Sequence, residues 1–266
     1  MTLNIWNMSG PWRQRREEIV AWLRFLDPDV VCLQEVLDSP GGMNQARWLA
    51  EHAGLGHNVV YGAGGEVNGH AFGNAVLTRW DVEGEEVLPL PRSEAPDDVA
   101  RVALHVRTHG IDVFTTHLAW RLDDSAVRQL QARAVADFVQ ERSRPGSPAV
   151  LAGDMNADPS ADEVRYLTGR TAIDGSSVCF LDAWETGGGG GAGNTWDNRN
   201  PFAVTEREPD RRIDYILLLW RAHAGAWFRH ARLVCDRSLT GTYASDHIGV
   251  LAELVVPDPR PAEGLG

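Results

Sequence analysis

A carboxylate and a carboxamide, Asp154 and Asn156, stand two residues apart where the apolar run VLAG (150–153) ends. An extended loop places side chains two positions apart on the same side of the chain, so the pair can act on one small group. A carboxylate can take a proton from water, and an amide N–H can donate to a developing negative charge. The spacing therefore suggests acid–base chemistry at the end of a buried strand.

Further polar residues stand where other apolar runs begin or end. They are Asn7, Glu35, His117, Asp214, Asp246 and His247. Taken singly, each has an ordinary structural explanation: Glu35 as a solvated strand end, His117 as a hydrogen-bonded core imidazole, and Asp154 as a turn residue. A whole series of such residues is harder to explain by structure alone, and it predicts a polar site where the strand ends meet.

Asp214 has the least ordinary surroundings of this series. Ile213 precedes it and the apolar run 215–218 follows it, so its carboxylate lies within a buried strand pattern. A buried carboxylate without a partner costs several kcal/mol. Asp214 therefore needs a cation or a hydrogen-bond donor.

The elements that must position these residues follow from apolar periodicity. Strands are predicted at residues 2–6, 29–34, 74–79, 101–106, 112–118, 149–153, 211–220 and 247–256. Two helical stripes are predicted, formed by Ile19, Trp22, Leu23 and Leu26, and by Val127, Leu130, Ala134 and Phe138. Many strands, few helices and short polar turns predict a mixed α/β sandwich and not the regular alternation of a Rossmann fold.

Length and composition bound the class of protein. The chain has 266 residues, 43% of them hydrophobic and 23% charged, so it can bury a sizeable core. We expect a single domain over residues 1–256 and a disordered, Pro-rich tail over residues 257–266. No apolar stretch approaches the roughly 20 residues of a membrane span, and the first residues do not resemble a secretion signal. A cytoplasmic location is therefore expected.

Charge and cysteine content narrow the partners. With 25 Lys and Arg against 37 Asp and Glu, the formal net charge is −12. This charge disfavours strong non-specific binding to DNA, but it is compatible with a local site whose charge a metal ion screens. Cys32, Cys179 and Cys235 are odd in number and form no CxxC pair, so neither a disulfide framework nor a zinc site is indicated. We expect a monomer.

Six segments carry a family resemblance in this order: RFLDPDVVCLQEV, GNAVLTR, FTTHL, LAGDMNADP, RRIDYIL and SDHIGV. Together they resemble the motif series of the endonuclease/exonuclease/phosphatase superfamily, which includes DNase I, sphingomyelinases and tyrosyl-DNA phosphodiesterases. The resemblance implies a DNase I-like α/β fold, a four-layer sandwich of two mixed β-sheets packed face to face and flanked by helices. It places the site at the sheet edges where these segments converge.

The resemblance also implies a divalent metal site. Glu35 would be the principal Mg²⁺ ligand, with Asn7 close by and Asp246 on the metal or phosphate side. Mg²⁺ prefers oxygen donors and keeps several waters, which suits this set, and Mn²⁺ is expected to substitute. Nucleases of the superfamily commonly have an acidic residue two positions after Asn7, where this chain has Ser9, so one carboxylate of the metal site is missing here.

By the same resemblance, Asp154 and Asn156 bind or orient the attacking water and the phosphoryl oxygen. His247 is the imidazole of the site and Asp214 is its orienting carboxylate, with a neighbouring arginine as the alternative partner of Asp214. His117 resembles the histidine that faces the leaving oxygen in the DNase and sphingomyelinase branches. The resemblance leaves two candidates for the general base, His247 and Asp154.

Three further residues are candidates for substrate binding. Trp196 lies in NTWDNRNP (194–201), which resembles a segment of sphingomyelinases and tyrosyl-DNA phosphodiesterases. It can stack on a base or cover a lipid headgroup, or it can simply anchor its loop. Arg101 can contact phosphate or form a solvated strand flank. Asn74 belongs to the shared motif GNAVLTR, without a role that follows from its surroundings.

These expectations converge on Mg²⁺-dependent hydrolysis of a phosphoester by in-line attack of water. The first candidate is a phosphodiesterase that acts on a small molecule or a nucleic-acid end. The second is a DNA or RNA nuclease, which ranks lower because the sequence has no basic stripe with interleaved aromatic residues. The third is a catalytically inactive binding module, against which the complete series of site residues argues.

Overall fold

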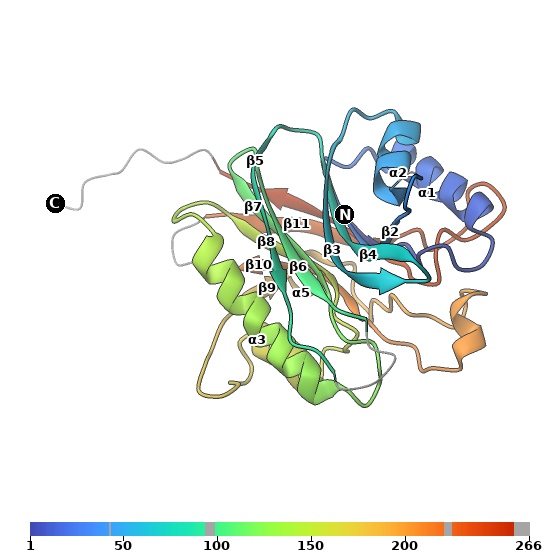
Figure 1. Ribbon diagram of the computed structural model, residues 1–266. Helices are drawn as coiled ribbons and strands as arrows, with labels where there is room; N and C mark the ends of the chain where they lie inside the picture. The colour runs from blue at the N-terminus through green and yellow to red at the C-terminus, as the bar shows by residue number, and fades with distance from the viewer. Residues whose placement is uncertain (43, 94–98, 221–224, 258–266) are drawn as a thin grey trace.

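The computed structural model describes residues 1–42, 44–93, 99–220 and 225–257. Their strands form two six-stranded sheets that pack face to face, with helices on the outer sides (Figure 1). The layers run helix, sheet, sheet, helix, so the predicted four-layer α/β sandwich is confirmed. The predicted tail, residues 257–266, lies outside the described residues from position 258 onward.

The first sheet takes strands from both ends of the described chain, in the order β11, β12, β1, β2, β4, β3. These strands are β1 (Thr2–Asn4), β2 (Val30–Asp38), β3 (Asn58–Val67), β4 (His70–Thr78), β11 (Trp227–Val234) and β12 (Gly249–Val255). β1 runs parallel to β2, and the other neighbouring pairs are antiparallel. Two helices, α1 (Trp12–Leu26) and α2 (Gln45–Ala53), cover its outer face.

The second sheet takes its strands from the middle of the chain, in the order β5, β6, β7, β8, β10, β9. These strands are β5 (Val82–Pro89), β6 (Val102–Thr108), β7 (Ile111–His117), β8 (Ala149–Asp154), β9 (Phe180–Asp182) and β10 (Asp214–Leu219). β7 and β8 run parallel, and the other neighbouring pairs are antiparallel. The long helix α3 (Ser125–Arg142) and the short helix α4 (Asp162–Leu167) cover its outer face, while α5 (Ala183–Gly187) and the 3-10 helix η1 (Ala203–Glu206) lie in connections.

The two-residue period of the strands builds both cores at once. In β2, Val31 and Leu33 pack among the outer helices, whereas Cys32 lies in the apolar layer between the sheets. Val113, Ala152 and other residues of the second sheet meet Cys32 in that layer. The burial of successive side chains on opposite faces therefore fixes the register of each strand.

The eight predicted strands are all present, as β1, β2, β4, β6, β7, β8, β10 and β12, whereas β3, β5, β9 and β11 were not predicted. The apolar stripe predicted for α3 was only partly right, since Phe138 is buried and Ala134 packs against the core. Leu130 is 50% exposed, and the buried face carries Arg128, Gln131 and Val135 instead. The reason is that polar side chains occupy part of the buried face, so apolar residues alone do not mark it.

Candidate active site

Neighbouring strands of the second sheet end at one level and bring three predicted residues together. His117 is opposite Asp154 in the β7 and β8 pairing, and Asp154 is opposite Asp214 in the β8 and β10 pairing. All three side chains are buried. The predicted meeting of polar strand ends is therefore present at this edge of the sheet.

These strand ends border a pocket of about 310 Å³. The predicted residues that line it are Asn7, Glu35, Arg101, His117, Asp154, Asn156, Trp196, Asp246 and His247. A larger cavity of about 790 Å³, lined by residues such as Cys32, Ile216 and Phe228, lies at the opposite ends of the strands and includes none of these residues. We take the smaller pocket as the candidate active site because the groups that can do chemistry line it.

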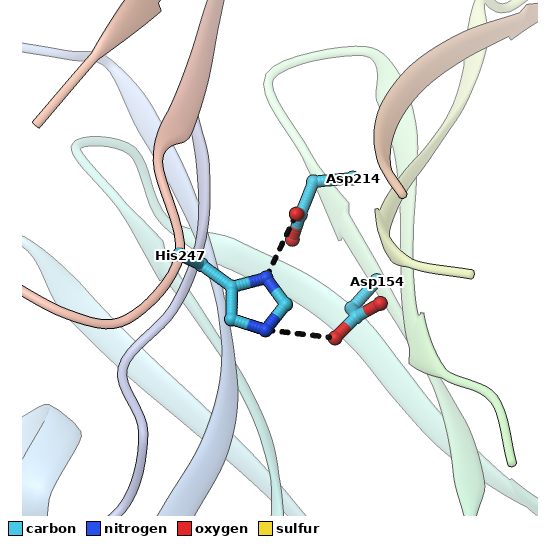
Figure 2. Close-up of side chains that lie close together, drawn as sticks. All are labelled: Asp154, Asp214 and His247. Carbon is cyan, nitrogen blue, oxygen red and sulfur yellow. Dashed lines mark hydrogen bonds and ion pairs between the residues drawn. The ribbon is translucent and has the colours of Figure 1, made fainter. Parts of the chain in front are cut away.

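His247 bridges two aspartates (Figure 2). Its Nδ1 lies 2.9 Å from Asp214 Oδ2, and its Nε2 lies 3.7 Å from Asp154 Oδ2. Burial opposes the charged imidazole, but Asp214 and Asp154 outweigh this effect and hold the pKa of His247 well above its usual value. Ligand atoms of the three residues lie within 4.8 Å of one another, so a metal ion between them would compete with the His247 proton.

Two arginines that precede Asp214 in the sequence were its alternative partners, and both are engaged elsewhere. Arg211 pairs with Glu208, and Arg212 Nη1 donates to Asp182 Oδ2 at 2.5 Å. The other oxygen of Asp214, Oδ1, is buried without a hydrogen-bond partner among the described residues. The structure therefore gives Asp214 a histidine as its partner and not an arginine.

His117 is held in one tautomer. Arg101 Nη1 lies 2.8 Å from His117 Nδ1, and because a guanidinium can only donate, Nδ1 must accept. Burial, then Arg101 and then His247 lower the pKa of His117 well below its usual value, so the ring is neutral and its proton sits on Nε2. Nε2 lies 3.4 Å from Asp154 Oδ2. His117 therefore presents an N–H donor beside the Asp154 carboxylate.

Asp154 has a further contact that the sequence analysis missed. Asn4 Nδ2 donates to Asp154 Oδ2 at 3.0 Å and to Glu35 Oε1 at 3.2 Å, so one amide links the two sheets across the site. Burial and the neighbouring charge of Asp214 raise the pKa of Asp154 to about 6, although His247 opposes the shift. Asn4 lies within the first predicted strand, residues 2–6, so nothing in the sequence marked it as a residue of the site.

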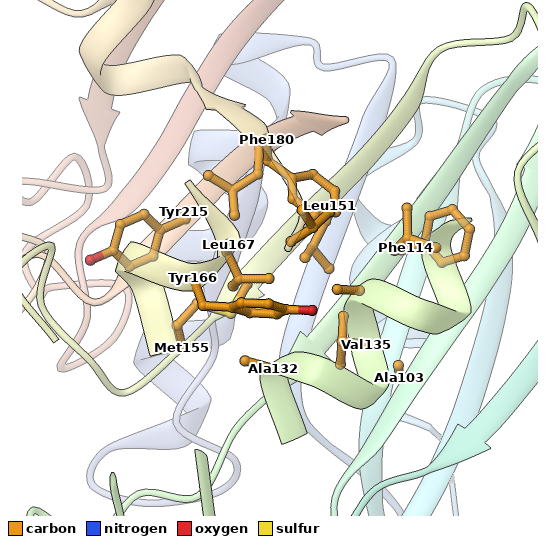
Figure 3. Close-up of a cluster of buried hydrophobic side chains, with 14 of the residues drawn as sticks. Ala103, Phe114, Ala132, Val135, Leu151, Met155, Tyr166, Leu167, Phe180 and Tyr215 are labelled. Carbon is orange, nitrogen blue, oxygen red and sulfur yellow. The ribbon is translucent and has the colours of Figure 1, made fainter. Parts of the chain in front are cut away.

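Hydrophobic packing behind the site fixes the strands that carry these groups (Figure 3). Leu151 of β8, Met155 just after it and Tyr215 of β10 belong to one buried cluster with Val135 of α3 and Tyr166 of α4. Side chains on the opposite face of the same strands point toward the other sheet. Asp154 and Asp214 are thus the ends of strands that are packed on both faces.

The predicted metal residues face the pocket from the first sheet. Asn7 Nδ2 donates to Glu35 Oε2 at 2.7 Å, and Asp246, which is 6% exposed, accepts from Ser245 Oγ at 3.0 Å. Burial raises the pKa of Asp246 to about 7; His247 opposes this shift and Glu35 adds to it. Two carboxylates that repel each other at a polar pocket are a donor set that fits a hard divalent cation such as Mg²⁺ or Mn²⁺.

Ser9 has a structural part in this arrangement. β1 stops at Asn4, so Asn7 lies in the following turn and not at the strand end itself. Asn7 Oδ1 accepts hydrogen bonds from the backbone N and the Oγ of Ser9, both at 2.9 Å. Ser9 therefore orients Asn7 at the position where the family resemblance implied an acidic residue.

Four pocket residues have left-handed backbone conformations. The φ angles are 52° at Trp6, 38° at Asn7, 58° at Glu35 and 49° at Asn156. Glu35 lies at an irregularity in the β2 and β4 pairing. Such conformations cost about 1–3 kcal/mol each in non-glycine residues and gather where side-chain direction matters for function. At these four positions the backbone adopts conformations of higher energy, and the side chains line the pocket.

The remaining predicted residues differ in their placement. Asn156 Nδ2 donates to the Leu118 carbonyl at 3.1 Å, and the rings of Trp196 and His247 are arranged edge to face, with 5.2 Å between centroids. Trp196 Nε1 is buried without a hydrogen-bond partner among the described residues. Asn74 is not among the described residues that line the pocket. Its Nδ2 donates to the Val102 carbonyl at 3.0 Å and so connects the two sheets.

Fold and site together define a DNase I-like sandwich with a carboxylate and imidazole pocket at one sheet edge. The model of the endonuclease/exonuclease/phosphatase family matches residues 1–247, and the chain therefore belongs to this family. Members of the family hydrolyse phosphoester bonds. Among the described helices, none has the length and apolar character needed to cross a membrane.

Curated relatives resemble the chain at low identity. Tyrosyl-DNA phosphodiesterase 2 of Rattus norvegicus is 26% identical over 262 residues, which are 94% of this chain and 66% of that protein. The angel protein of Drosophila melanogaster is 27% identical over 184 residues, which are 63% of this chain and 50% of that protein. The chain thus spans only half to about two thirds of these relatives.

Solved structures share the fold. An endonuclease/exonuclease/phosphatase from Beutenbergia cavernae superposes with a TM-score of 0.68 at 25% identity, over 96% of this chain and 70% of the other. A TDP2 of D. rerio, complexed with a single-strand DNA product, superposes with a TM-score of 0.72 at 22% identity, over 96% and 97%.

Proposed function

We propose that the chain is a divalent-metal-dependent phosphodiesterase in which water is the nucleophile. The observation that carries this proposal is the Asp154 carboxylate, which lies beside the imidazoles of His117 and His247. Glu35 and Asp246 line the same pocket. One pocket thus offers a proton acceptor, N–H donors and oxygen ligands, the groups that hydrolysis of a phosphoester requires.

Asp154 is the general base in this proposal. With a pKa of about 6 it is ionised at neutral pH and can take the proton of an attacking water. His247, whose pKa is raised by Asp214 and Asp154 against the effect of burial, is an imidazolium and has no lone pair with which to accept a proton. His247 therefore donates toward the phosphoryl group, and Asp214 holds its ring in place.

His117 and Asn156 stabilise the charge that develops during the reaction. The neutral His117 ring carries its proton on Nε2, on the side of Asp154 and the pocket. Asn156 Nδ2 uses one N–H for the Leu118 carbonyl and keeps a second N–H. Buried donors of this kind are worth more than donors in water because no solvent has to reorganise around them.

Glu35 and Asp246 would hold the metal, and Asn7, whose Nδ2 donates to Glu35 Oε2, would orient the Glu35 carboxylate. A divalent cation at this position would neutralise charge on the phosphoryl oxygens and help to orient the diester. Mg²⁺ is expected, with Mn²⁺ as a substitute, because the donors are oxygens. Arg101 and Trp196, which line the same pocket, are proposed to contact the substrate.

The preferred substrate is a small or single-ended phosphodiester. A nucleic-acid end is included because the D. rerio relative is described with a single-strand DNA product. A nuclease that works along polymers is the second candidate, and the net charge of −12 ranks it lower. An inactive binding module gains no support, since the described site keeps each predicted acid–base group.

A panel of phosphoesters, assayed with Mg²⁺, with Mn²⁺ and with excess EDTA, tests the proposal. We expect cleavage of bis(p-nitrophenyl) phosphate and of a labelled oligonucleotide end, and loss of both activities in EDTA. Asp154→Asn protein, purified in the same way, controls for contaminating enzymes. Activity that survives EDTA would contradict the metal requirement, and cleavage only within long polymers would favour the nuclease.

We further propose a monomeric, single-domain protein over residues 1–256 with a cytoplasmic location. Cys32, Cys179 and Cys235 are free thiols, which is typical of a reducing compartment. Light scattering after size-exclusion chromatography would test the oligomeric state, and cell fractionation would test the location.

A further inference from the structure

Arg15, on the first turns of α1, is a buried cation without a carboxylate partner. Its side chain is 0% exposed, and it forms no ion pair within the described part of the chain. A buried charge of this kind is costly unless polar groups replace the lost water. The contacts of Arg15 therefore show what the protein uses in place of solvent.

Backbone carbonyls take the place of water around the guanidinium. Nη1 donates to the carbonyls of Ile5 and Ala244 at 2.8 and 3.0 Å, Nε donates to Ser9 at 3.1 Å, and Nη2 donates to Trp6, Asn7 and Ser9 at 3.1, 3.1 and 2.7 Å. Every nitrogen of the side chain is thus engaged. A single side chain binds the turn 5–9 to the segment before β12.

Both segments carry predicted metal residues. Asn7 lies within the turn 5–9, and Ala244 comes two residues before Asp246. Trp6 and Asn7 have φ angles of 52° and 38°, so this turn is strained and needs external support to persist. The carbonyls of these two residues are among those that Arg15 holds.

The charge of Arg15 lies near the two carboxylates of the metal side. Burial lowers the pKa of Arg15 to about 10, while Asp246 and Glu35 act against this shift, so the group stays cationic at neutral pH. Its positive charge offsets the mutual repulsion of Asp246 and Glu35 in the metal-free protein. Arg15 thus acts on the site through geometry and through charge.

We propose that Arg15 is a positioning residue that holds the metal-facing segments, residues 5–9 and 244–246, in their binding geometry before a metal ion arrives. The proposal rests on the proposed function in one respect, that Glu35 and Asp246, with Asn7 beside them, form the binding site of a divalent cation. A purely structural Arg15 would instead stabilise the fold without any effect on ion affinity.

Arg15→Lys separates these possibilities because it keeps the charge but offers at most three hydrogen bonds to five carbonyls. We expect Mn²⁺ affinity, measured from the free Mn²⁺ signal in electron paramagnetic resonance, to fall roughly 10–100-fold, as for other residues that orient ligands. Arg128→Lys is the matched control. Arg128 is 4% exposed, binds the Ala119 and Arg121 carbonyls and, unlike Arg15, also pairs with a carboxylate, Glu163; its change should lower the melting temperature and leave Mn²⁺ affinity unaltered.

Unchanged Mn²⁺ affinity in folded Arg15→Lys would overturn the proposal. Arg15→Met removes the charge as well as the hydrogen bonds. If this variant bound Mn²⁺ more tightly than wild type, Arg15 would only repel cations, and this result would also overturn the proposal. We expect weaker binding in both variants.

Hydrogen exchange on the wild type keeps the proposal testable if the variants do not fold. Amides of residues 5–9 should be protected without metal and should change little when Mn²⁺ is added. Rapid exchange that slows only with Mn²⁺ would mean that the ion, and not Arg15, orders the turn. The exchange experiment does not depend on phosphodiester cleavage, so it tests Arg15 separately. A protein that cleaves no phosphodiester would refute the proposed function, while protected amides in the same protein would still agree with the role of Arg15.

Discussion

Asp154 shows how a single residue can combine contacts from different parts of the chain. Its Oδ2 lies near Asn4, His117 and His247, and its Oδ1 accepts from the backbone N of Asn156 at 2.8 Å. His247, Asn4 and the Asn156 backbone favour the ionised carboxylate and act against burial and Asp214, which raise the pKa of Asp154. The balance leaves a carboxylate that can exchange a proton near neutral pH.

Glu35→Gln tests the metal side with little change in shape. We expect the variant to fold normally and to lose roughly a hundredfold or more in activity, because a catalytic cation is worth several kcal/mol of charge stabilisation. Titration with Mg²⁺ by calorimetry, beside circular dichroism as a folding control, measures both effects. Full activity of the variant in excess EDTA would refute a metal role for Glu35.

Asp214→Asn and His247→Ala test whether the pair acts as one unit. Each change should lower turnover strongly, and the double variant should be little worse than His247→Ala, because Asp214 acts through the histidine. Steady-state kinetics of the three variants gives the coupling. Additive losses in the double variant, or an unstable Asp214→Asn protein with full activity, would show that Asp214 only holds its strand.

The raised pKa values predict how pH affects the metal-free protein. Asp154 and Asp246 bind their protons more tightly in the folded chain than in the unfolded one, so their contribution to stability is present at low pH. It is lost as pH rises through about 6 and about 7. Mg²⁺, which neutralises these charges, should therefore raise the melting temperature more above pH 7 than below pH 6. Equal effects of Mg²⁺ in thermal scans on both sides of this range would argue against Asp246 on the metal side.

For single residues, the sequence showed which acidic and histidine side chains belong to the pocket, but it did not show which side chains contact one another there. The acidic and histidine members of the pocket could be predicted because they interrupt apolar runs at strand ends. Asn4 and Arg15 could not, since a strand asparagine and an arginine in a polar helical turn are ordinary in sequence. Their importance comes from neighbours far along the chain: Asp154 for Asn4, and Ala244 for Arg15.

Among the elements, β8 positions the site because it pairs with β7 and β10 at the same time. Gly153 permits this pairing: a Cβ at this position would lie 2.0 Å from the Thr116 carbonyl oxygen, and φ is 151°. Only glycine allows so close an approach of two backbones. The residue after it is Asp154, so the direction of the proposed general base depends on this glycine.

Gly153→Ala should therefore reduce stability and activity together. Overpacking at such a contact costs roughly 1–3 kcal/mol or more, which corresponds to a fall of several degrees in melting temperature. Gly84→Ala on β5 is the matched control, because a Cβ there meets no atom within 4 Å. A Gly153→Ala protein as stable and active as the control would contradict the close packing of β7 on β8.

Elements with strong apolar runs were predicted, and those without them were missed. β3 contains Gly62, Gly64 and Gly65, and β5 is a solvated edge strand with the sequence VEGEEVLP, so neither shows the apolar signal of a core strand. In α3, Arg128 and Gln131 face inward because they bind loop groups such as the Ala119 carbonyl and N–H. The helix was predicted, but its buried face depends on hydrogen bonds that periodicity does not record.

At the scale of the whole molecule, the net charge of −12 affects how substrates approach the protein more than it affects the reaction in the pocket. Long polyanions meet a repulsive surface, while a small diester meets only the local field of the pocket. This difference separates the first candidate function from the second.

Binding to duplex DNA should accordingly be weak and should fall steeply with salt, whereas turnover of a small diester should change little. Fluorescence anisotropy with labelled duplex, across a series of ionic strengths, measures the first quantity, and the same series in a diester assay measures the second. Tight duplex binding that resists salt would promote the nuclease.

The two sheets carry different halves of the proposed chemistry. Asn7, Glu35 and Asp246 belong to the first sheet or its flanking turns, whereas His117, Asp154 and Asp214 end strands of the second. Ion binding would then be a property of one sheet, and hydrolysis a property of the docked pair. In a refolding experiment the order of appearance becomes informative: ion affinity can return once the first sheet has formed, but turnover must wait until the sheets associate. The recovery of turnover, measured beside the recovery of ion affinity, would then report when the two sheets associate.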